Sequence, residues 1–457
     1  MRLSAGIINS RVRQNSLNRR SLLRFDYLLP IAVSVLMLAD MFFMSLPVQA
    51  VLLLMLAFFI VRCNLYENIF LLLLYYPVAF GFILNARGIF GLGGALSLVG
   101  MAILFWWMLK GGNKLNNFWK TSLLFCLLII WFGLSALTTV GGTFAMSKWG
   151  RTALNGFTAL LAFSFLFSNL KKIDTVKLGL CYLVYSACLL RWAIQINGIP
   201  GPSGLFDIAF LRFQTIQFLG YEPQSFHVDY QNLGFYCVLG SGYALIADDG
   251  KSVLRSSIII LLSTVMALYS GSRQAIITMF TVILLWIFMF RKGRFFIKLL
   301  FSMAFVAGLF YVVPLLIERE GVLNSVVSYG YLDGGGRGEW LSSGIEQFKM
   351  NPLTGVGFGR YRVFGRYGSY PHNIIIELLC ETGIYGLLFA VALSSVSIWK
   401  CKKHFPVVLF IFWVFLMRSM ASDSLAANIT LFSIIFSLFA FESGPVRNKV
   451  LLWRELS

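Results

Sequence analysis

The fold of this chain is decided by residues 118–140, which read FWKTSLLFCLLIIWFGLSALTTV and contain a single charged residue, Lys120. A helix that crosses a bilayer needs about 20 consecutive, mostly apolar residues, so this stretch is long enough to span a membrane. Runs of the same kind recur from Tyr27 to Phe441 with short polar breaks between them. Lipid must therefore solvate much of the chain.

Composition extends this conclusion to the whole protein. Hydrophobic residues make up 58% of the 457 residues and charged residues only 12%, whereas about a quarter of an average soluble domain is charged. We predict an all-α fold, a polytopic transmembrane helical bundle of about 12 to 14 spans, in which residues 1–457 form a single integral membrane domain. The expected spans are residues 27–46, 48–61, 65–84, 89–109, 118–140, 149–170, 176–196, 230–247, 253–269, 274–290, 295–317, 373–398, 405–417 and 424–441.

The basic residues predict the orientation of these spans. Lys and Arg recur at every second break, and this side of the bundle holds 25 of the 38 basic residues but only 7 of the 19 acidic ones. Cytoplasmic loops carry the excess of positive charge, so we assign this side and both termini to the cytoplasm. The net charge of +19 is then a consequence of topology, and no basic folded domain remains that could bind nucleic acid. All seven Cys lie in spans or at their ends, which implies no disulfide framework.

Two breaks are long enough to hold a site, residues 197–229 and residues 318–372, and both are expected on the extracytoplasmic face. Loops longer than about 15 residues are usually functional or disordered. The larger loop contains a predicted helix over Arg337 to Met350. Its apolar residues fall on one face, as in a helix that lies in the membrane interface or caps a bundle. These residues are Trp340, Leu341, Ile345 and Phe348.

The same face collects ionisable groups that suit phosphate and hydroxyl chemistry. An Arg side chain is a planar cation that binds phosphate oxygens in pairs, although a single loop Arg is equally explained as a solvated charge or a headgroup anchor. His372 stands at the entry of a predicted span, where its imidazole could act as a general base or simply as a polar helix cap. The Arg candidates are Arg212, Arg273, Arg337, Arg360, Arg362 and Arg366.

Two carboxylates lie inside the predicted span that follows His372. Glu377 and Glu381 are one helical turn apart, and carboxylates at such a depth are costly unless they are paired. They therefore mark either a site or a structural ion pair, and we favour the pair, with Arg191 as its candidate partner. The glycine-rich run over residues 355–359 lacks the strand and helix of a dinucleotide site, so we interpret it as flexible backbone over a site. No cluster of Cys and His and no paired Asp motif indicates a metal.

Four motifs occur together in the last third of the chain. They are Arg337-Gly-Glu-Trp340, Asn351-Pro-Leu-Thr-Gly-Val-Gly-Phe-Gly359, Pro371-His-Asn373 and Glu381-Thr-Gly-Ile-Tyr-Gly386. In this order they resemble the O-antigen ligase and polymerase superfamily of bacterial membrane glycosyltransferases. The turn that ends in Arg273 looks like the helix-boundary Arg of that family, and the three predicted spans after the large loop also fit it.

The resemblance implies an enzyme of the bacterial cytoplasmic (inner) membrane with its active site on the outer, periplasmic face. It would transfer a glycan from an undecaprenyl diphosphate carrier to a glycan or lipid-linked acceptor, without nucleotide sugar, metal or other cofactor. It assigns the role of base to His372 and makes Arg273 and Arg337 the preferred diphosphate ligands. Arg212, Arg360 and Glu222 are further substrate-binding candidates. Membrane lipids and other proteins of polysaccharide assembly are the expected partners, and the glycine-rich run would help to roof the glycan.

Three functions stay open at this point. A polymerase extends another carrier-linked repeat unit, and the first long loop, with GYEPQSFH at residues 220–227, resembles O-antigen and exopolysaccharide polymerases. An O-antigen ligase would transfer the glycan to lipid A core instead. In a lipid-linked glycan flippase we would expect inverted repeats and polar groups that line a path through both leaflets. The ionisable residues of this chain instead gather on one face. A purely structural scaffold would leave the Arg residues unexplained.

Overall fold

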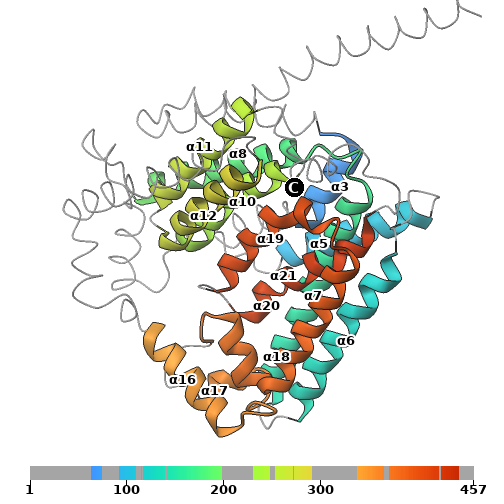
Figure 1. The fold of residues 1–457 in the computed structure, drawn as a ribbon, viewed down its shortest axis with the longest axis vertical. Helices are drawn as coiled ribbons and strands as arrows, with labels where there is room; N and C mark the ends of the chain where they lie inside the picture. The colour runs from blue at the N-terminus through green and yellow to red at the C-terminus, as the bar shows by residue number, and fades with distance from the viewer. Residues whose placement is uncertain are drawn as a thin grey trace, which may run out of the picture.

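A computed structural model of the chain describes eleven stretches of residues, and within them every regular element is helical, which confirms the predicted all-α class (Figure 1). The predicted spans at residues 27–46, 48–61 and 295–317 lie outside this part. The described residues are 63–74, 92–109, 115, 117–138, 142–197, 230–246, 253–270, 272–290, 337–364, 370–420 and 424–441.

Most helices begin and end close to the predicted boundaries. Helix α16 begins and ends at the two predicted residues, Arg337 and Met350. Within the described residues, α6 and α18 are long and apolar enough to cross a membrane on their own, so the total number of crossings stays a prediction. The helices are α3 (Leu65–Leu74), α5 (Leu92–Leu109), α6 (Phe118–Leu137), α7 (Gly142–Ser168), α8 (Thr175–Asn197), α10 (Tyr230–Leu245), α11 (Val253–Ser270), α12 (Arg273–Phe290), α16 (Arg337–Met350), α17 (Tyr361–Phe364), α18 (Ile374–Lys400) and α19 (Phe405–Ser419). The last predicted span is divided into α20 (Leu425–Asn428), α21 (Thr430–Phe436) and a 3-10 turn over Ser437–Ala440.

Two groups of helices meet along α19 and α21 (Figure 1). In the first group, α10 packs on α8, α11 and α12. Small residues permit this approach, because a Cβ added at Gly179 of α8 would collide with the carbonyl oxygen of Gly240 of α10. In the second group, α6 and α7 pack together and α16 packs on α18.

Large apolar side chains remain exposed on α5, α6 and α18. Leu109 is 87% exposed, Leu137 70% and Trp399 67%. Soluble proteins rarely leave such residues in contiguous patches, whereas lipid solvates them without cost. The exposed surface of α5, α6 and α18 is therefore that of a membrane protein.

Helix α18 is broken at Gly383, where φ is 66° and ψ is −171°. The break leaves backbone groups without intrahelical partners, and residues 352–357 satisfy them. The N–H groups of Val356 and Gly357 donate to the carbonyl oxygens of Cys380 and Glu381 at 2.7 and 3.0 Å. A short half-helix, residues 374–382, is thereby separated from the rest of α18.

The glycine-rich run over residues 355–359 occupies a different place from the one expected. Gly355, Gly357 and Gly359 have positive φ, a conformation that glycine adopts without steric cost. Phe358 between them is fully buried and stacks on Phe132 of α6 with ring centroids 5.0 Å apart. The expectation of a flexible roof is therefore corrected: the run is packed between α6 and the broken part of α18, because the break offers hydrogen bonds that a surface loop would not find.

Candidate functional site

The C-terminal end of α19 joins two segments that lie far apart in the sequence. The side-chain amide of Gln274 donates to the carbonyl oxygen of Met417 at 2.9 Å, and that of Asn373 donates to the carbonyl oxygen of Met420 at 3.1 Å. Gln274 directly follows Arg273, and Asn373 directly follows His372. One turn of α19, called the α19 junction below, therefore holds the helix ends that carry the predicted diphosphate ligand and the predicted base.

His372 has an unusual backbone, with φ at 56°. A non-glycine residue in this left-handed region is uncommon, although His, Asn and Asp adopt it more readily than other residues, and such strain clusters at functional sites. The next residue, Asn373, is extended and caps α18 by accepting N–H bonds from Ile375 and Ile376 at 3.0 and 3.2 Å. The helix cap is therefore Asn373 and not His372.

Aromatic rings fix the orientation of that imidazole. It stacks on Trp340 with centroids 4.5 Å apart and planes 21° apart, and Tyr370 lies at the same centroid distance. Trp340 is itself anchored, because the hydroxyl of Tyr361 donates to its carbonyl oxygen at 2.9 Å. Burial raises the pKa of Tyr361 to about 12, so this phenol stays protonated and remains a donor at physiological pH.

Helix α16 approaches α18 closely through a face of small and polar residues. Ser343, Gly344 and Gln347 are buried, and a Cβ added at Gly344 would lie 2.6 Å from the Cγ2 atom of Ile376. Ile345 is instead 40% exposed. The small and polar face is thus the most buried side of α16, and the contact with α18 brings Trp340 to His372.

The two glutamates below His372 are paired, as predicted. Lys148 of α7 donates to Glu377 Oε1 at 2.6 Å and to both carboxylate oxygens of Glu381 at 2.7 and 2.6 Å. The partner that the structure shows is Lys148, and the side chain of the predicted partner, Arg191, lies outside the described part of α8. Lys148 was overlooked because we placed it just before a span beginning at residue 149, whereas α7 begins at Gly142 and buries it.

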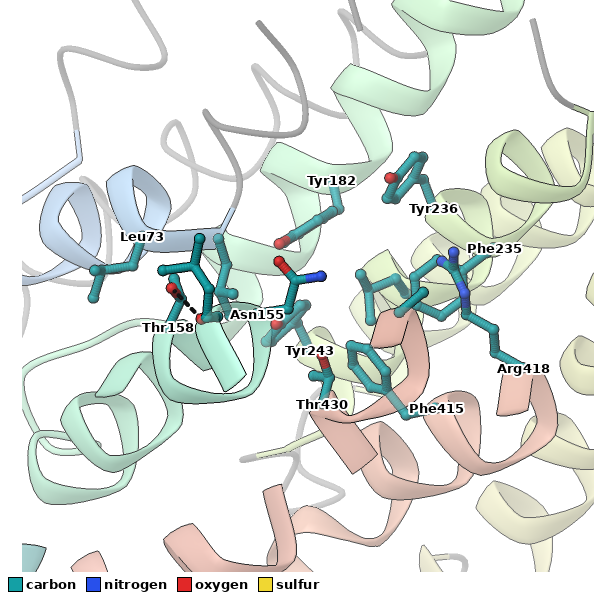
Figure 2. A pocket seen from close by; sticks show the side chains of 14 residues that line it. Leu73, Asn155, Thr158, Tyr182, Phe235, Tyr236, Tyr243, Phe415, Arg418 and Thr430 are labelled. Carbon is teal, nitrogen blue, oxygen red and sulfur yellow. Dashed lines mark hydrogen bonds between the residues drawn. The ribbon is translucent and has the colours of Figure 1, made fainter. Parts of the chain in front are cut away.

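A pocket of about 280 Å³ opens beside Arg418 of α19, and Figure 2 shows the side chains around it. The guanidinium carbon of Arg418 lies 4.0 Å from the ring centroid of Phe235. Arg418 is the one charged residue among the described residues that line the pocket. We missed it in the sequence, where its only signal is a cation directly after the predicted end of a span. The other labelled lining residues are Leu73, Asn155, Thr158, Tyr182, Phe235, Tyr236, Tyr243, Phe415 and Thr430.

The remaining predicted residues are placed in part. Arg337 is the first residue of α16 and Arg273 the first of α12, but neither side chain is described. Arg360 is half-buried after the glycine-rich run, and Arg362 is exposed with its guanidinium 5.0 Å from the ring of Phe144. Arg212, Glu222 and Arg366 lie outside the described residues. Within the described ranges, no three His, Cys, Asp or Glu residues gather as metal ligands.

Comparison with known families supplies the context for this geometry. Residues 258–391 match a family model described as O-antigen ligase. The match runs from α11 into the second half of α18 and includes the starts of α12 and α16, the glycine-rich run, His372 and both paired glutamates. Lys148 and Arg418 lie outside it, and no curated protein matches the chain. The match over residues 258–391 thus supports the resemblance to the O-antigen ligase and polymerase superfamily that the motifs predicted.

Proposed function

We propose that this protein is a glycosyltransferase that uses an undecaprenyl-diphosphate-linked oligosaccharide as donor, and that it polymerises O-antigen or exopolysaccharide repeat units. The observation that carries the proposal is the α19 junction. Its hydrogen bonds to Gln274 and Asn373 hold the helix ends of Arg273 and His372 against one turn of α19. Both helix ends fall within the segment that matches the family.

The reaction needs a base and a stabilised leaving group. A hydroxyl of the acceptor attacks the anomeric carbon of the donor sugar, and the imidazole of His372 takes the hydroxyl proton. The bond between that carbon and the diphosphate oxygen breaks, and the diphosphate leaves with the bonding electrons. Arg273 and Arg337 stabilise its growing negative charge, because preorganised cations are most effective where charge develops.

The described surroundings of His372 support its role as the base. Stacking on Trp340 and the cap at Asn373 restrict both the ring and the backbone, so little freedom is left to be lost in the transition state. Correct placement of reacting groups contributes several kcal/mol to catalysis, on the order of 7 to 11 in the best cases. A base held at the tip of a capped helix meets this requirement.

The pocket beside Arg418 supports a site for the lipid-linked substrate. Ligand pockets combine mostly apolar walls with a few polar groups that set orientation, and this pocket joins leucine and aromatic walls to one guanidinium and several hydroxyls. We assign to it the part of the lipid carrier next to the diphosphate. Arg360, Arg212 and Glu222 are proposed to contact the glycan.

The proposal includes a topology. Both termini and the basic breaks would face the cytoplasm, and the loops at residues 197–229 and 318–372 would lie on the periplasmic face of the inner membrane. The donor glycan is presented on that face, so His372 must be there too. Labelling of a Cys at position 372 from the cytosol alone would exclude the proposed reaction.

A ligase is the second candidate, because the matching family model is itself described as O-antigen ligase. The two functions differ in the acceptor and share the donor and the base. Purified protein in proteoliposomes should be incubated with a carrier-linked repeat unit, with and without lipid A core. Longer carrier-linked products support the polymerase, and glycan on lipid A core alone supports the ligase. If neither product forms, the glycosyltransferase proposal is overturned.

A further inference from the structure

The reaction above makes no use of a buried group of charges, the Lys148 cluster, which consists of Lys148, Glu377 and Glu381. Their side chains are 6%, 0% and 1% exposed. One ammonium and two carboxylates have a net charge of −1 when all are ionised. Burying ions costs several kcal/mol each, so the contacts of this cluster must serve some purpose in the molecule.

Every carboxylate oxygen of the cluster has a donor. Lys148 donates to three of them at 2.6 to 2.7 Å, and the backbone N–H of Leu425, the first residue of α20, donates to Glu377 Oε2 at 2.8 Å. The ammonium of Lys148 also lies 5.0 Å from the ring centroid of Phe358. The cluster therefore ties α7, α20 and the glycine-rich run to one piece of α18.

That piece is the half-helix of residues 374–382, with His372 at its tip. It is about 13 Å long at 1.5 Å per residue, and the break at Gly383 separates it from the rest of α18. Its direction is therefore set by the contacts at its two ends. Asn373 holds the end near His372, and the Lys148 cluster holds the other end together with the N–H groups of Val356 and Gly357.

We propose that Lys148 is a positioning residue, whose contacts with Glu377 and Glu381 aim the half-helix and thereby place His372. This inference rests on the proposed function. Without the ammonium, two carboxylates would face each other in a dry environment, where like charges repel strongly. The half-helix would tilt, and a displacement of about 1 Å at a reacting group can cost about 100-fold in rate.

According to the proposal, a residue from the first half of the chain positions the base of the site. Lys148 lies in α7, far ahead of residues 258–391, which match the family. A matched control exists in α8, where Lys177 lies 3.5 Å from the buried carboxylate of Glu67 in α3. The lysine side chain of this pair is 12% exposed and its carboxylate 1%, and the pair joins α3 to α8 without holding any part of α18.

The test uses the full-length protein in proteoliposomes, with kcat expressed per molecule that elutes as folded protein. Lys148→Met should lower kcat about 100-fold while KM for the donor changes less than about threefold. The triple variant Lys148→Met, Glu377→Gln, Glu381→Gln removes every charge of the Lys148 cluster and should fold, because an entire buried ion group can often be replaced without loss of stability. It should still have low kcat, and Lys177→Met should retain wild-type kcat.

Several results would overturn the inference. A folded triple variant with wild-type kcat would show that the cluster only compensates its own charges. Failure of both Lys148 variants to fold would show a purely structural role, and a large rise in KM with unchanged kcat would point to substrate binding. Absence of transfer by the wild-type protein would instead count against the proposed function.

Discussion

Two histidines lie in the described part of the chain, and both stand at the beginning of a helix and stack on an aromatic ring. His372 stacks on Trp340 with centroids 4.5 Å apart, and His404, directly before α19, stacks on Phe441 at 4.7 Å. Their backbones differ, because φ is 56° at His372 and −100° at His404. Stacking at a helix start is therefore not a mark of function, whereas backbone strain beside an anchored cap distinguishes His372.

Their electrostatic surroundings differ as well. Burial, and then the charge of Lys403, lower the pKa of His404, so its neutral form is favoured. The ring of His404 is half-buried and packs on Phe441. The ring of His404 has a packing role, whereas His372 lies next to the α19 junction and at the tip of the half-helix.

The largest expected effect is that of His372→Asn, and His404→Asn is its control. Asn tolerates the left-handed backbone of position 372, so His372→Asn should fold and yet lose its base, with kcat for glycan transfer lower by about 10²- to 10⁴-fold. His404→Asn should stay within about twofold of the wild type. Transfer is measured on a carrier-linked repeat unit. Equal losses in both variants, or none in His372→Asn, would remove the distinction between the two residues.

The helix behind each histidine provides the next test, because α18 is broken after nine residues and α19 is continuous. Gly383→Ala introduces a Cβ that would collide with the backbone of Leu353 at a positive φ. We expect a loss of about 1 to 3 kcal/mol in stability and lower transfer activity. Gly150→Ala in α7 is the matched control, since its Cβ would meet no atom within 4 Å. Thermal unfolding in detergent checks both variants, and similar melting temperatures would contradict the strain argument.

Removing the anchor beside His372 should have a smaller effect. Asn373→Ala loses the cap of α18 and the bond to Met420, which should cost about 1 kcal/mol in stability. It should also lower kcat about tenfold, because the strained residue before it is no longer held. Asn373→Asp keeps the cap but not the donor to Met420, and should recover the stability more than the activity. Full activity in Asn373→Ala would mean that stacking alone places the imidazole.

The smallest effect concerns pH. Because the pKa of His404 is lowered on folding, the unfolded chain binds the proton more readily, and stability should fall as pH drops below the unfolded value of about 6.5. His404→Gln should reduce the difference in melting temperature between about pH 7.5 and pH 5.5. The pH profile of transfer should not change in this variant. A shifted activity profile would assign a functional titration to His404.

Local sequence patterns predicted several features correctly. The bounds of α16 follow from a glycine run before Arg337 and Asn351-Pro352 after Met350, and the membrane character follows from apolar runs. Glu377 and Glu381 were recognised as a pair because carboxylates in an apolar span require compensation. Their partner was not predicted, since Lys148 lies 229 residues before Glu377 and nothing in the local pattern joins the two.

The sequence by itself determined the helical class, the apolar character of the chain and the match of residues 258–391 to the O-antigen ligase family model, because hydropathy and short motifs are properties of neighbouring residues. Tertiary structure alone decided which charges meet, where α18 breaks, which pocket Arg418 lines and how Gln274 and Asn373 meet at the α19 junction. These features depend on hydrogen bonds and close contacts between helices, whose geometry exists only after the segments have packed.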